Sequence, residues 1–142
     1  MSETVEAGVL RHEIRVIFGD TDQMGVVYYA NYLRFFEASR AAYWRAGCRT
    51  HKDLDAWGVA LPVVEAHARY HRPAFYEDLL AIELEVTELR AASLRFAYLV
   101  RRGAEVLASG FTRHAVVGPT GRPRALPPEL RGAITVAQLA LP

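Results

Sequence analysis

The segment 26–46 is apolar over most of its circumference when it is drawn as a helix. Tyr29, Tyr32, Phe36 and Tyr43 fall on one side of that helix at helical spacing. Four further residues widen the apolar arc: Tyr28, Leu33, Phe35 and Trp44. A helix that is apolar nearly all round must be enclosed by other structure rather than laid on a surface. We therefore predict a long buried helix from about Val26 to Ala46, ended by the glycine that follows it.

Much of the remaining chain carries the period of two that is typical of β-strands. In residues 79–89 every second position from 80 to 86 is Leu, Ile or Val, and residues 93–101 alternate in the same way. The predicted strands are 11–18, 61–71, 79–89, 93–101 and 105–117. A short helix is predicted over 51–57, because Thr50 and Asp53 have the spacing of a capping box. Another short helix is predicted to begin near Pro128.

This order of elements predicts an α+β fold. Consecutive strands joined by short connections pair antiparallel. An antiparallel sheet of about five strands, wrapped around one long central helix, accommodates both the strands and the apolar helix. With 142 residues, the chain is expected to form a single domain over 1–142. Such a sheet leaves edge strands that need protection, which the pairing of two copies edge to edge would provide.

The composition argues against several classes of function. The 17 basic and 16 acidic residues give a net charge of +1, which is too balanced for a dedicated nucleic-acid binder. No stretch approaches the roughly 18 consecutive apolar residues of a membrane span, so no membrane insertion is expected. The N-terminal residues lack the pattern of a signal peptide, so we expect a cytoplasmic protein. Cys48 is the only cysteine, and the histidines show no HExxH pattern, so we predict no metal site.

The turn at residues 19–25 is the strongest candidate for a reaction site. Asp22 lies just before the predicted helix, whose first N–H groups have no partner inside the helix and carry the positive end of its dipole. Gly25 leaves space for a ligand there. A carboxylate beside free N–H donors can attack a carbonyl or activate water while the donors hold the oxyanion. The alternative is that Asp20 or Asp22 merely caps the helix.

Tyr28, Tyr29 and Tyr32 follow this turn and could line a slot for an acyl or aryl group. The alternative is that they are ordinary core aromatics. Glu37, farther along the same helix, has the spacing to pair with Arg40, and we expect it to have a structural role.

The segment Val16–Tyr32, with the sequence VIFGDTDQMGVVYYANY, resembles the signature of the hotdog-fold acyl-CoA thioesterases. The branch it resembles is that of 4-hydroxybenzoyl-CoA thioesterase and the YbgC-type enzymes. The similarity continues at residues 36–40, 70–74, 78, 90, 93–94 and 123–127, and so covers nearly the whole chain. The first segment is the most specific one.

The resemblance implies a hotdog fold that hydrolyses acyl-CoA without a metal or cofactor. Asp22 would be the catalytic carboxylate, as nucleophile or as general base, and the backbone N–H of Tyr29 would polarise the thioester carbonyl. Gly25 would keep that approach open. Two chains would pair through their sheets, often as a dimer of dimers, with each active site built by both chains. Many YbgC-type sequences have His where this chain has Tyr29, so an imidazole has no role at that position here.

Four residues, in the predicted turn at 90–93 and in the C-terminal tail, are candidate contacts for the phosphates of coenzyme A: Arg90, Ser93, Arg122 and Arg124. Arginine suits phosphate because its planar donors bind two oxygens at once; the alternative is solvated surface arginine. A second possible function is a non-catalytic module that binds acyl thioesters or a protein. A hotdog dehydratase is a third, but its chemistry needs a histidine near the turn, and none lies there.

Overall fold

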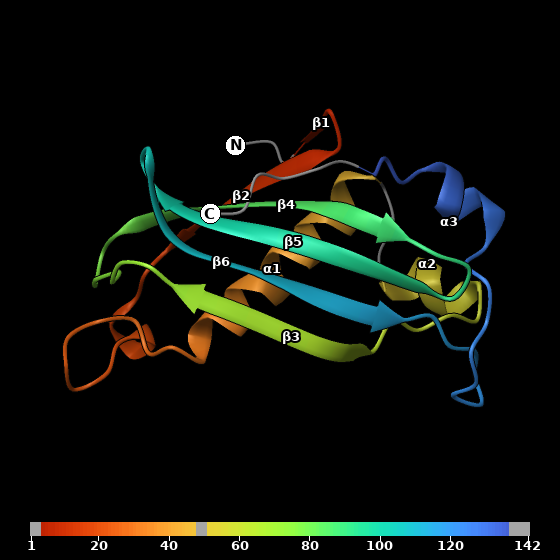
Figure 1. The fold of residues 1–142 in the computed structure, drawn as a ribbon, viewed down its shortest axis with the longest axis horizontal. Coiled ribbons are helices and arrows are strands. Elements are labelled where there is room, and N and C mark those ends of the chain that lie inside the picture. Colours follow the sequence, from red (N-terminus) through yellow and green to blue (C-terminus); the bar gives the residue numbers. More distant parts are fainter. Residues whose placement is uncertain (1–3, 48–50, 137–142) are drawn as a thin grey trace.

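The computed structural model describes residues 4–47 and 51–136, without the side chains of residues 51 and 52. One six-stranded sheet, in the order β1-β2-β4-β5-β6-β3, has antiparallel pairing between all neighbours (Figure 1). The strands are β1 (Val5–Glu6), β2 (Val9–Arg15), β3 (Val63–Tyr70), β4 (Leu79–Leu89), β5 (Ser93–Arg102) and β6 (Glu105–Ala115). Short connections between β4, β5 and β6 produce a meander, as the sequence predicted.

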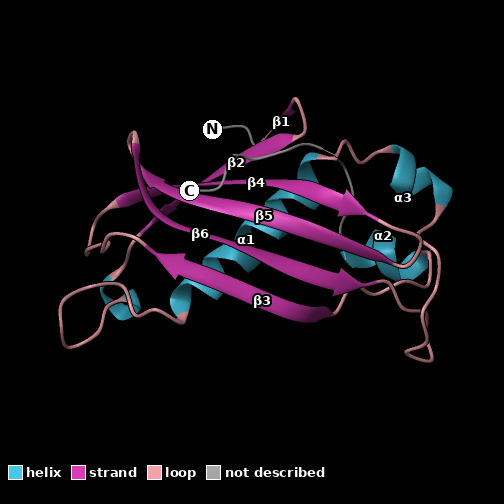
Figure 2. Ribbon diagram, viewed as in Figure 1, coloured by secondary structure: helices cyan, strands magenta, loops and turns pink. Residues whose placement is uncertain are grey.

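Helix α1 (Asn31–Ala46) runs diagonally behind the sheet (Figure 2). Its Phe36 ring stacks on Tyr98 of β5, with the ring centroids 4.1 Å apart. Gly110 of β6 permits this close packing, because a Cβ there would lie 2.9 Å from the Phe36 ring. The inward positions of β4 predicted from the alternation are fully buried, namely Leu80, Ile82, Leu84 and Val86. The predicted sheet wrapped around a long helix is therefore confirmed.

The start of α1 was predicted wrongly: it lies at Asn31, five residues after Val26. In the segment between Val26 and Asn31, backbone N–H groups donate to residues outside the segment instead of forming helical hydrogen bonds. The Val27 N–H donates to the carbonyl oxygen of Ala74 at 2.8 Å, and the Tyr28 N–H donates to that of Asp20 at 2.9 Å. These bonds hold the segment in an extended loop, so helix formation begins only after it.

The first predicted strand is also displaced. It was expected at 11–18, but β2 ends at Arg15, and Phe18 lies in the 3₁₀ helix η1 (Phe18–Asp20) with 74% of its surface exposed. The chain leaves the sheet where the Ile17 N–H donates to the Asp20 carboxylate at 3.0 Å. In a strand over 11–18, positions 14, 16 and 18 would share one face. Because β2 ends early, Phe18 does not lie on that face with Ile14 and Val16.

Two short helices, α2 (His51–Ala56) and α3 (Pro128–Gly132), confirm the predictions at the ends of the sheet. The proposed cap Thr50 lies outside the described residues, as does Cys48. No helix within the described ranges is both long and apolar enough to cross a membrane.

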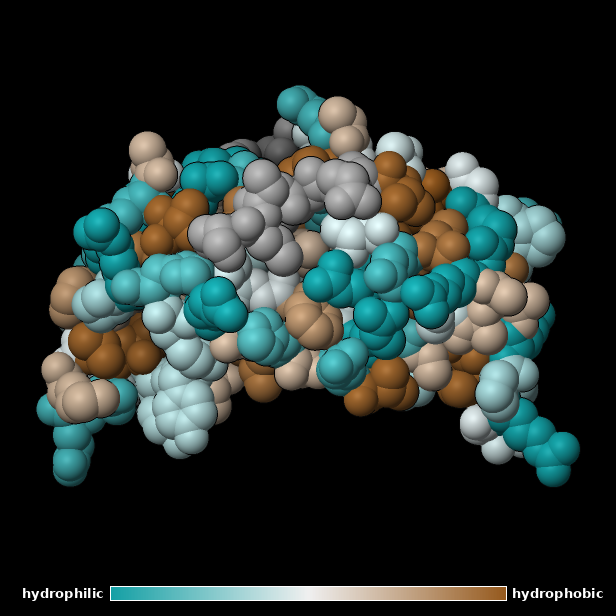
Figure 3. Space-filling model, in the orientation of Figure 1, coloured by the Kyte–Doolittle hydropathy of each residue, from teal (hydrophilic) through white to brown (hydrophobic). Residues whose placement is uncertain are grey.

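The outer face of the sheet, opposite α1, carries hydrophilic side chains mixed with apolar ones (Figure 3). Ion pairs cross this face. Arg113 of β6 pairs with Glu65 of the neighbouring β3 at 3.3 Å and reaches across β5 to Glu88 of β4 at 2.7 Å. The apolar core lies on the other face, between α1 and the sheet.

Candidate active site

The loop between η1 and α1 folds back on itself around Asp22. The Asp22 N–H donates to the carbonyl oxygen of Val26 at 2.9 Å, and the Gly25 N–H donates to that of Asp22 at 2.9 Å. Gly25 has a φ of +80°, a left-handed conformation that favours glycine. A Cβ at this position would meet no other atom of the described chain within 4 Å. The backbone conformation thus accounts for the glycine, and its role in ligand access stays a prediction.

The two aspartates of this loop have different environments. Asp20 is buried, and its carboxylate accepts a hydrogen bond from the Ile17 N–H at 3.0 Å and pairs with the Arg34 guanidinium. Asp22 is partly exposed, and its Oδ1 accepts a hydrogen bond from the Met24 N–H at 2.9 Å. Its Oδ2 accepts none within the described ranges. Asp20 therefore stabilises the loop, whereas Asp22 keeps one carboxylate oxygen available.

Neither aspartate caps α1, so the capping alternative is wrong; the N-cap residue is Ala30. The chain enters the helix through a tight turn, in which the Asn31 N–H donates to the carbonyl oxygen of Tyr28 and the Leu33 N–H to that of Ala30. Among the described residues, the N–H groups of Tyr29 and Ala30 have no acceptor. These free donors at the positive end of a helix can stabilise an oxyanion.

Asp22 and Tyr29 line a common cavity of about 320 Å³. Tyr32 and Tyr70 form its aromatic wall, with ring centroids 5.1 Å apart. Burial raises the pKa of the Tyr32 hydroxyl to about 12, so this group stays protonated at neutral pH. The cavity thus brings a carboxylate with a free oxygen together with the residue that carries a free N–H, beside an apolar slot.

The three predicted tyrosines occupy different positions. Tyr29 and Tyr32 line the cavity, whereas Tyr28 does not line it and packs its ring against that of Tyr29, 4.8 Å away. Sequence reasoning did not single out Tyr70, whose hydroxyl donates to the carbonyl oxygen of Tyr29 at 3.0 Å. The sequence did offer one indication of Tyr70, because it begins the segment 70–74 that resembles the hotdog-fold thioesterases.

Comparison with known proteins identifies the family of the chain. The profile of the thioesterase-like superfamily matches residues 16–134 of the chain. The chain belongs to this superfamily. The acyl-CoA thioester hydrolase YbgC of Escherichia coli is 35% identical over 121 residues, which cover 84% of this chain and 90% of that protein. The resemblance stated from the sequence is therefore confirmed, and so is the class of enzyme, a thioesterase.

Two further relatives support the assignment. The 1,4-dihydroxy-2-naphthoyl-CoA hydrolase of Synechococcus elongatus is 37% identical over 118 residues, which cover 81% of this chain and 87% of that protein. The crystal structure of a 1,4-dihydroxy-2-naphthoyl-CoA thioesterase from Synechocystis aligns with a TM-score of 0.83 and 27% identity. It covers 89% of this chain and 96% of that one. The hotdog fold is thus confirmed.

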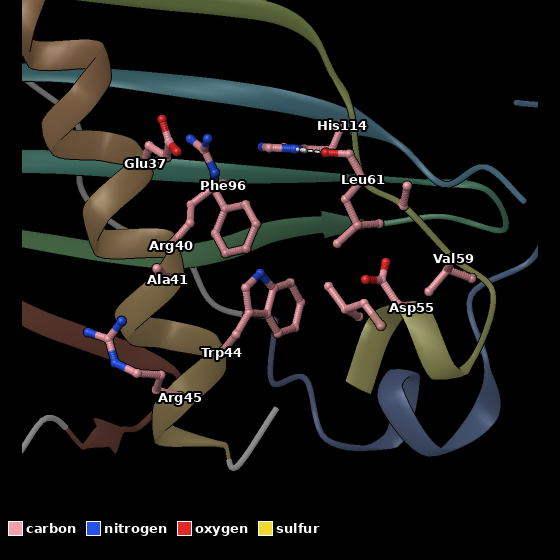
Figure 4. A pocket seen from close by; sticks show the side chains of 12 residues that line it. Glu37, Arg40, Ala41, Trp44, Arg45, Asp55, Val59, Leu61, Phe96 and His114 are labelled. Atoms are coloured by element: carbon pink, nitrogen blue, oxygen red, sulfur yellow. Dashed lines mark hydrogen bonds between the residues drawn. The ribbon is translucent and has the colours of Figure 1, made fainter. Parts of the chain in front are cut away.

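The thioesterase has a second cavity, of about 670 Å³, near the other end of α1 (Figure 4). Glu37 and Arg40 line it but form no ion pair with each other, so the pairing predicted from their spacing is wrong. Arg40 instead donates from Nη1 to the hydroxyl of Tyr98 at 3.1 Å, because its side chain reaches the sheet.

The candidate coenzyme A contacts of the thioesterase lie at the opposite end of the sheet from Asp22. Arg124 donates to the carbonyl oxygens of Trp57 and Gly58, just before β3, and Arg90 and Ser93 form the turn between β4 and β5. Arg122 belongs to the same end, since its carbonyl oxygen accepts from Gly118. Within one chain, these four residues are not brought together with Asp22.

No group of three or more His, Cys, Asp or Glu side chains that could hold a metal ion occurs within residues 4–47 and 51–136.

Proposed function

We propose that this thioesterase hydrolyses acyl-CoA thioesters to the free acid and coenzyme A, with Asp22 as the catalytic carboxylate. The observation that carries the proposal is the Oδ2 of Asp22, which accepts no hydrogen bond from the part of the chain that the structure describes. It lies in the cavity that Tyr29 also lines, and the Tyr29 N–H has no acceptor in that same part. The Escherichia coli and Synechococcus relatives are both named as hydrolases of coenzyme A thioesters, which supports the same substrate class.

In the proposed reaction, the thioester carbonyl oxygen accepts a hydrogen bond from the Tyr29 N–H, which increases the positive charge on the carbonyl carbon. Either the Asp22 carboxylate attacks that carbon or it takes a proton from an attacking water. The carbon–sulfur bond then breaks, and coenzyme A leaves as a thiolate that is protonated by solvent. In the first case water hydrolyses the resulting anhydride, so both routes consume one water and release one acid.

The positions of the candidate coenzyme A contacts favour a site shared between two copies of the chain. Arg90, Ser93, Arg122 and Arg124 are at the wrong end of the sheet to serve the Asp22 of their own chain. They could reach the site of a partner in a homodimer, which is the assembly proposed here, with a dimer of dimers as the larger form. We further propose that the protein is cytoplasmic and that residues 1–142 form one domain.

A panel of acyl-CoAs with a thiol-reactive dye tests the proposal. It should include short, long and aromatic acyl groups, because the sequence and fold leave the acyl group open. Release of thiol in proportion to enzyme is the expected result. Saturable binding of acyl-CoAs without any thiol release would instead support the alternative of a non-catalytic binding module.

A further inference from the structure

The loop that carries Asp22 is an antiparallel hairpin. Two backbone hydrogen bonds of 2.9 Å join its arms, one from the Asp22 N–H to the carbonyl oxygen of Val26 and one from the Tyr28 N–H to that of Asp20. Asp22 lies on the first arm, and Tyr29 directly follows the second. The hairpin therefore sets the position of the proposed catalytic carboxylate relative to the proposed oxyanion donor.

The side chain of Asn31, the first residue of α1, joins the helix to this hairpin. Its Nδ2 donates to the carbonyl oxygen of Asp20 at 2.8 Å, and the Tyr28 N–H donates to the same oxygen. A carbonyl oxygen can only accept, so the amide must present its nitrogen here. The partly buried Asn31 side chain thus holds the first turn of α1 against the arm that leads to Asp22.

The backbone of Asn31 holds the peptide group that carries the Tyr29 N–H. The Asn31 N–H donates to the carbonyl oxygen of Tyr28 at 2.9 Å. That carbonyl and the Tyr29 N–H belong to one planar trans peptide group, in which they point in opposite directions. The bond from Asn31 therefore fixes the direction of the Tyr29 N–H, for which residues 4–47 and 51–136 supply no acceptor.

The two hydrogen bonds of Asn31 depend on each other. The first N–H groups of a helix have no partner inside the helix, and helix ends fray. The bond from the Asn31 side chain to Asp20 removes this freedom, so the Asn31 N–H keeps its place under the Tyr28 carbonyl. Asp20 lies two residues before Asp22, so one side chain links the carboxylate arm to the oxyanion donor.

Arg34, three residues farther along α1, holds a different part of Asp20. Its guanidinium pairs with the Asp20 carboxylate, which also accepts a hydrogen bond from the Ile17 N–H at 3.0 Å. Arg34 therefore acts on the side chain of Asp20, whereas Asn31 acts on its carbonyl oxygen. This difference makes Arg34 a matched comparison for Asn31, because both residues join the same helix to the same aspartate.

We propose that Asn31 is a positioning residue for thioester hydrolysis, which aims the Tyr29 N–H at the thioester carbonyl and holds that donor at a fixed distance from the Asp22 carboxylate. The inference rests on the proposed function. Asn31 does not touch the substrate and acts through the peptide group between Tyr28 and Tyr29.

Steady-state kinetics test this role. Asn31→Leu is close to Asn in shape but cannot donate, so kcat should fall about ten- to hundredfold because the oxyanion donor is displaced. KM should change little. Asn31→Gln, which keeps an amide donor, should retain most of the wild-type kcat. If Asn31→Leu does not fold, Asn31→Ala takes its place. An unchanged kcat in the folded variant, beside a wild type that releases thiol, would refute the inference and leave the proposed function intact.

Two stable analogues separate positioning from a merely structural role. A ketone analogue, with a methylene in place of the thioester sulfur, keeps the carbonyl, and a thioether analogue, with a methylene in place of the carbonyl, lacks it. Asn31→Leu should bind the ketone about five- to tenfold more weakly, as expected for one lost hydrogen bond, and the thioether equally well. Equal losses for both analogues would refute the positioning role.

The infrared stretch of the bound ketone carbonyl reports the hydrogen bond directly. It should move to higher frequency in Asn31→Leu than in the wild type, because the donor is no longer aimed at the oxygen. Arg34→Gln, the matched comparison, should lower the midpoint of urea unfolding but keep the wild-type frequency. Equal shifts in the two variants would show that any loosening of the hairpin suffices, and would overturn the specific role of Asn31.

If the wild-type protein released no thiol from any acyl-CoA, the proposed function would fail instead. The ketone analogue of hexanoyl-CoA then tests the inference separately. A carbonyl frequency that differs between the wild type and Asn31→Leu would retain Asn31 as the residue that orients the donor, and equal frequencies would overturn it.

Discussion

The Tyr70 hydroxyl donates a hydrogen bond of 3.0 Å to the carbonyl oxygen of Tyr29, and this bond ties the end of β3 to the entry of α1. It restrains the peptide group that carries the free N–H of Ala30, next to the free N–H of Tyr29. We therefore expect Tyr70 to orient the N–H donors of the proposed oxyanion site through the Tyr29 peptide group, rather than to donate to the thioester carbonyl itself.

Replacing Tyr70 by Phe should lower kcat for acyl-CoA about three- to tenfold, as expected from the loss of one hydrogen bond worth about 1 kcal/mol. KM should change little, because the aromatic wall remains. Steady-state kinetics of thiol release give both values. A rise in KM at constant kcat would show that Tyr70 serves binding rather than positioning.

Asp20→Asn tests the structural role of the other aspartate. Asp20 is buried and bound to both Ile17 and Arg34, so removal of its charge should lower the free energy of unfolding by about 1–3 kcal/mol. Urea unfolding followed by circular dichroism measures this change. A midpoint equal to that of the wild type would contradict the assignment.

Gly110→Ala tests the packing of β6 against both α1 and β3. The new Cβ would overlap the backbone carbonyl oxygen of His67 in β3 and would lie 2.9 Å from the Phe36 ring. Both β3 and the helix must therefore shift, and we expect a loss of about 1–3 kcal/mol. Gly132→Ala is the matched control, since a Cβ there meets no other atom of the described chain within 4 Å. Thermal unfolding should separate the two variants clearly, and equal melting temperatures would argue against the packing described.

Stability should depend on pH through His114. Burial lowers the pKa of His114 from 6.5 to about 4 in the folded state, so between these values the unfolded chain binds more protons. Stability from this residue is therefore lost as the pH falls through 6.5 towards 4, by about 2 kcal/mol between pH 7 and pH 5. Urea unfolding of the wild type and of His114→Gln at both pH values isolates this contribution, because the other histidines are common to both. Equal losses in the two proteins would refute it.

The sequence predicted the parts of the fold that depend on local pattern. The alternation in β4 marked its inward side chains, and the apolar circumference of segment 26–46 required a helix enclosed by the sheet. The beginning of that helix could not be read in the same way. It is decided by hydrogen bonds from Val27 to Ala74 and from Tyr28 to Asp20, which join residues distant in sequence.

In the candidate site, too, residues of one continuous segment could be predicted, whereas contacts between distant segments could not. Asp22 and Tyr29 could be named from one motif because the loop that holds them is continuous in sequence. Tyr70 lies 41 residues from Tyr29, and Arg40 reaches Tyr98 rather than the nearby Glu37, so no spacing rule would have found either contact.

The central claim is that the Asp22 carboxylate performs the chemistry, and turnover of Asp22→Asn tests it most directly. The measurement is kcat for the best acyl-CoA of the panel, with circular dichroism and urea unfolding as controls for folding. The account predicts a loss of at least a hundredfold with an unfolding midpoint close to that of the wild type. Within residues 4–47 and 51–136, the Asp22 carboxylate accepts only one hydrogen bond, from the Met24 N–H at the exposed turn. A folded Asp22→Asn protein that retains near wild-type kcat would contradict it.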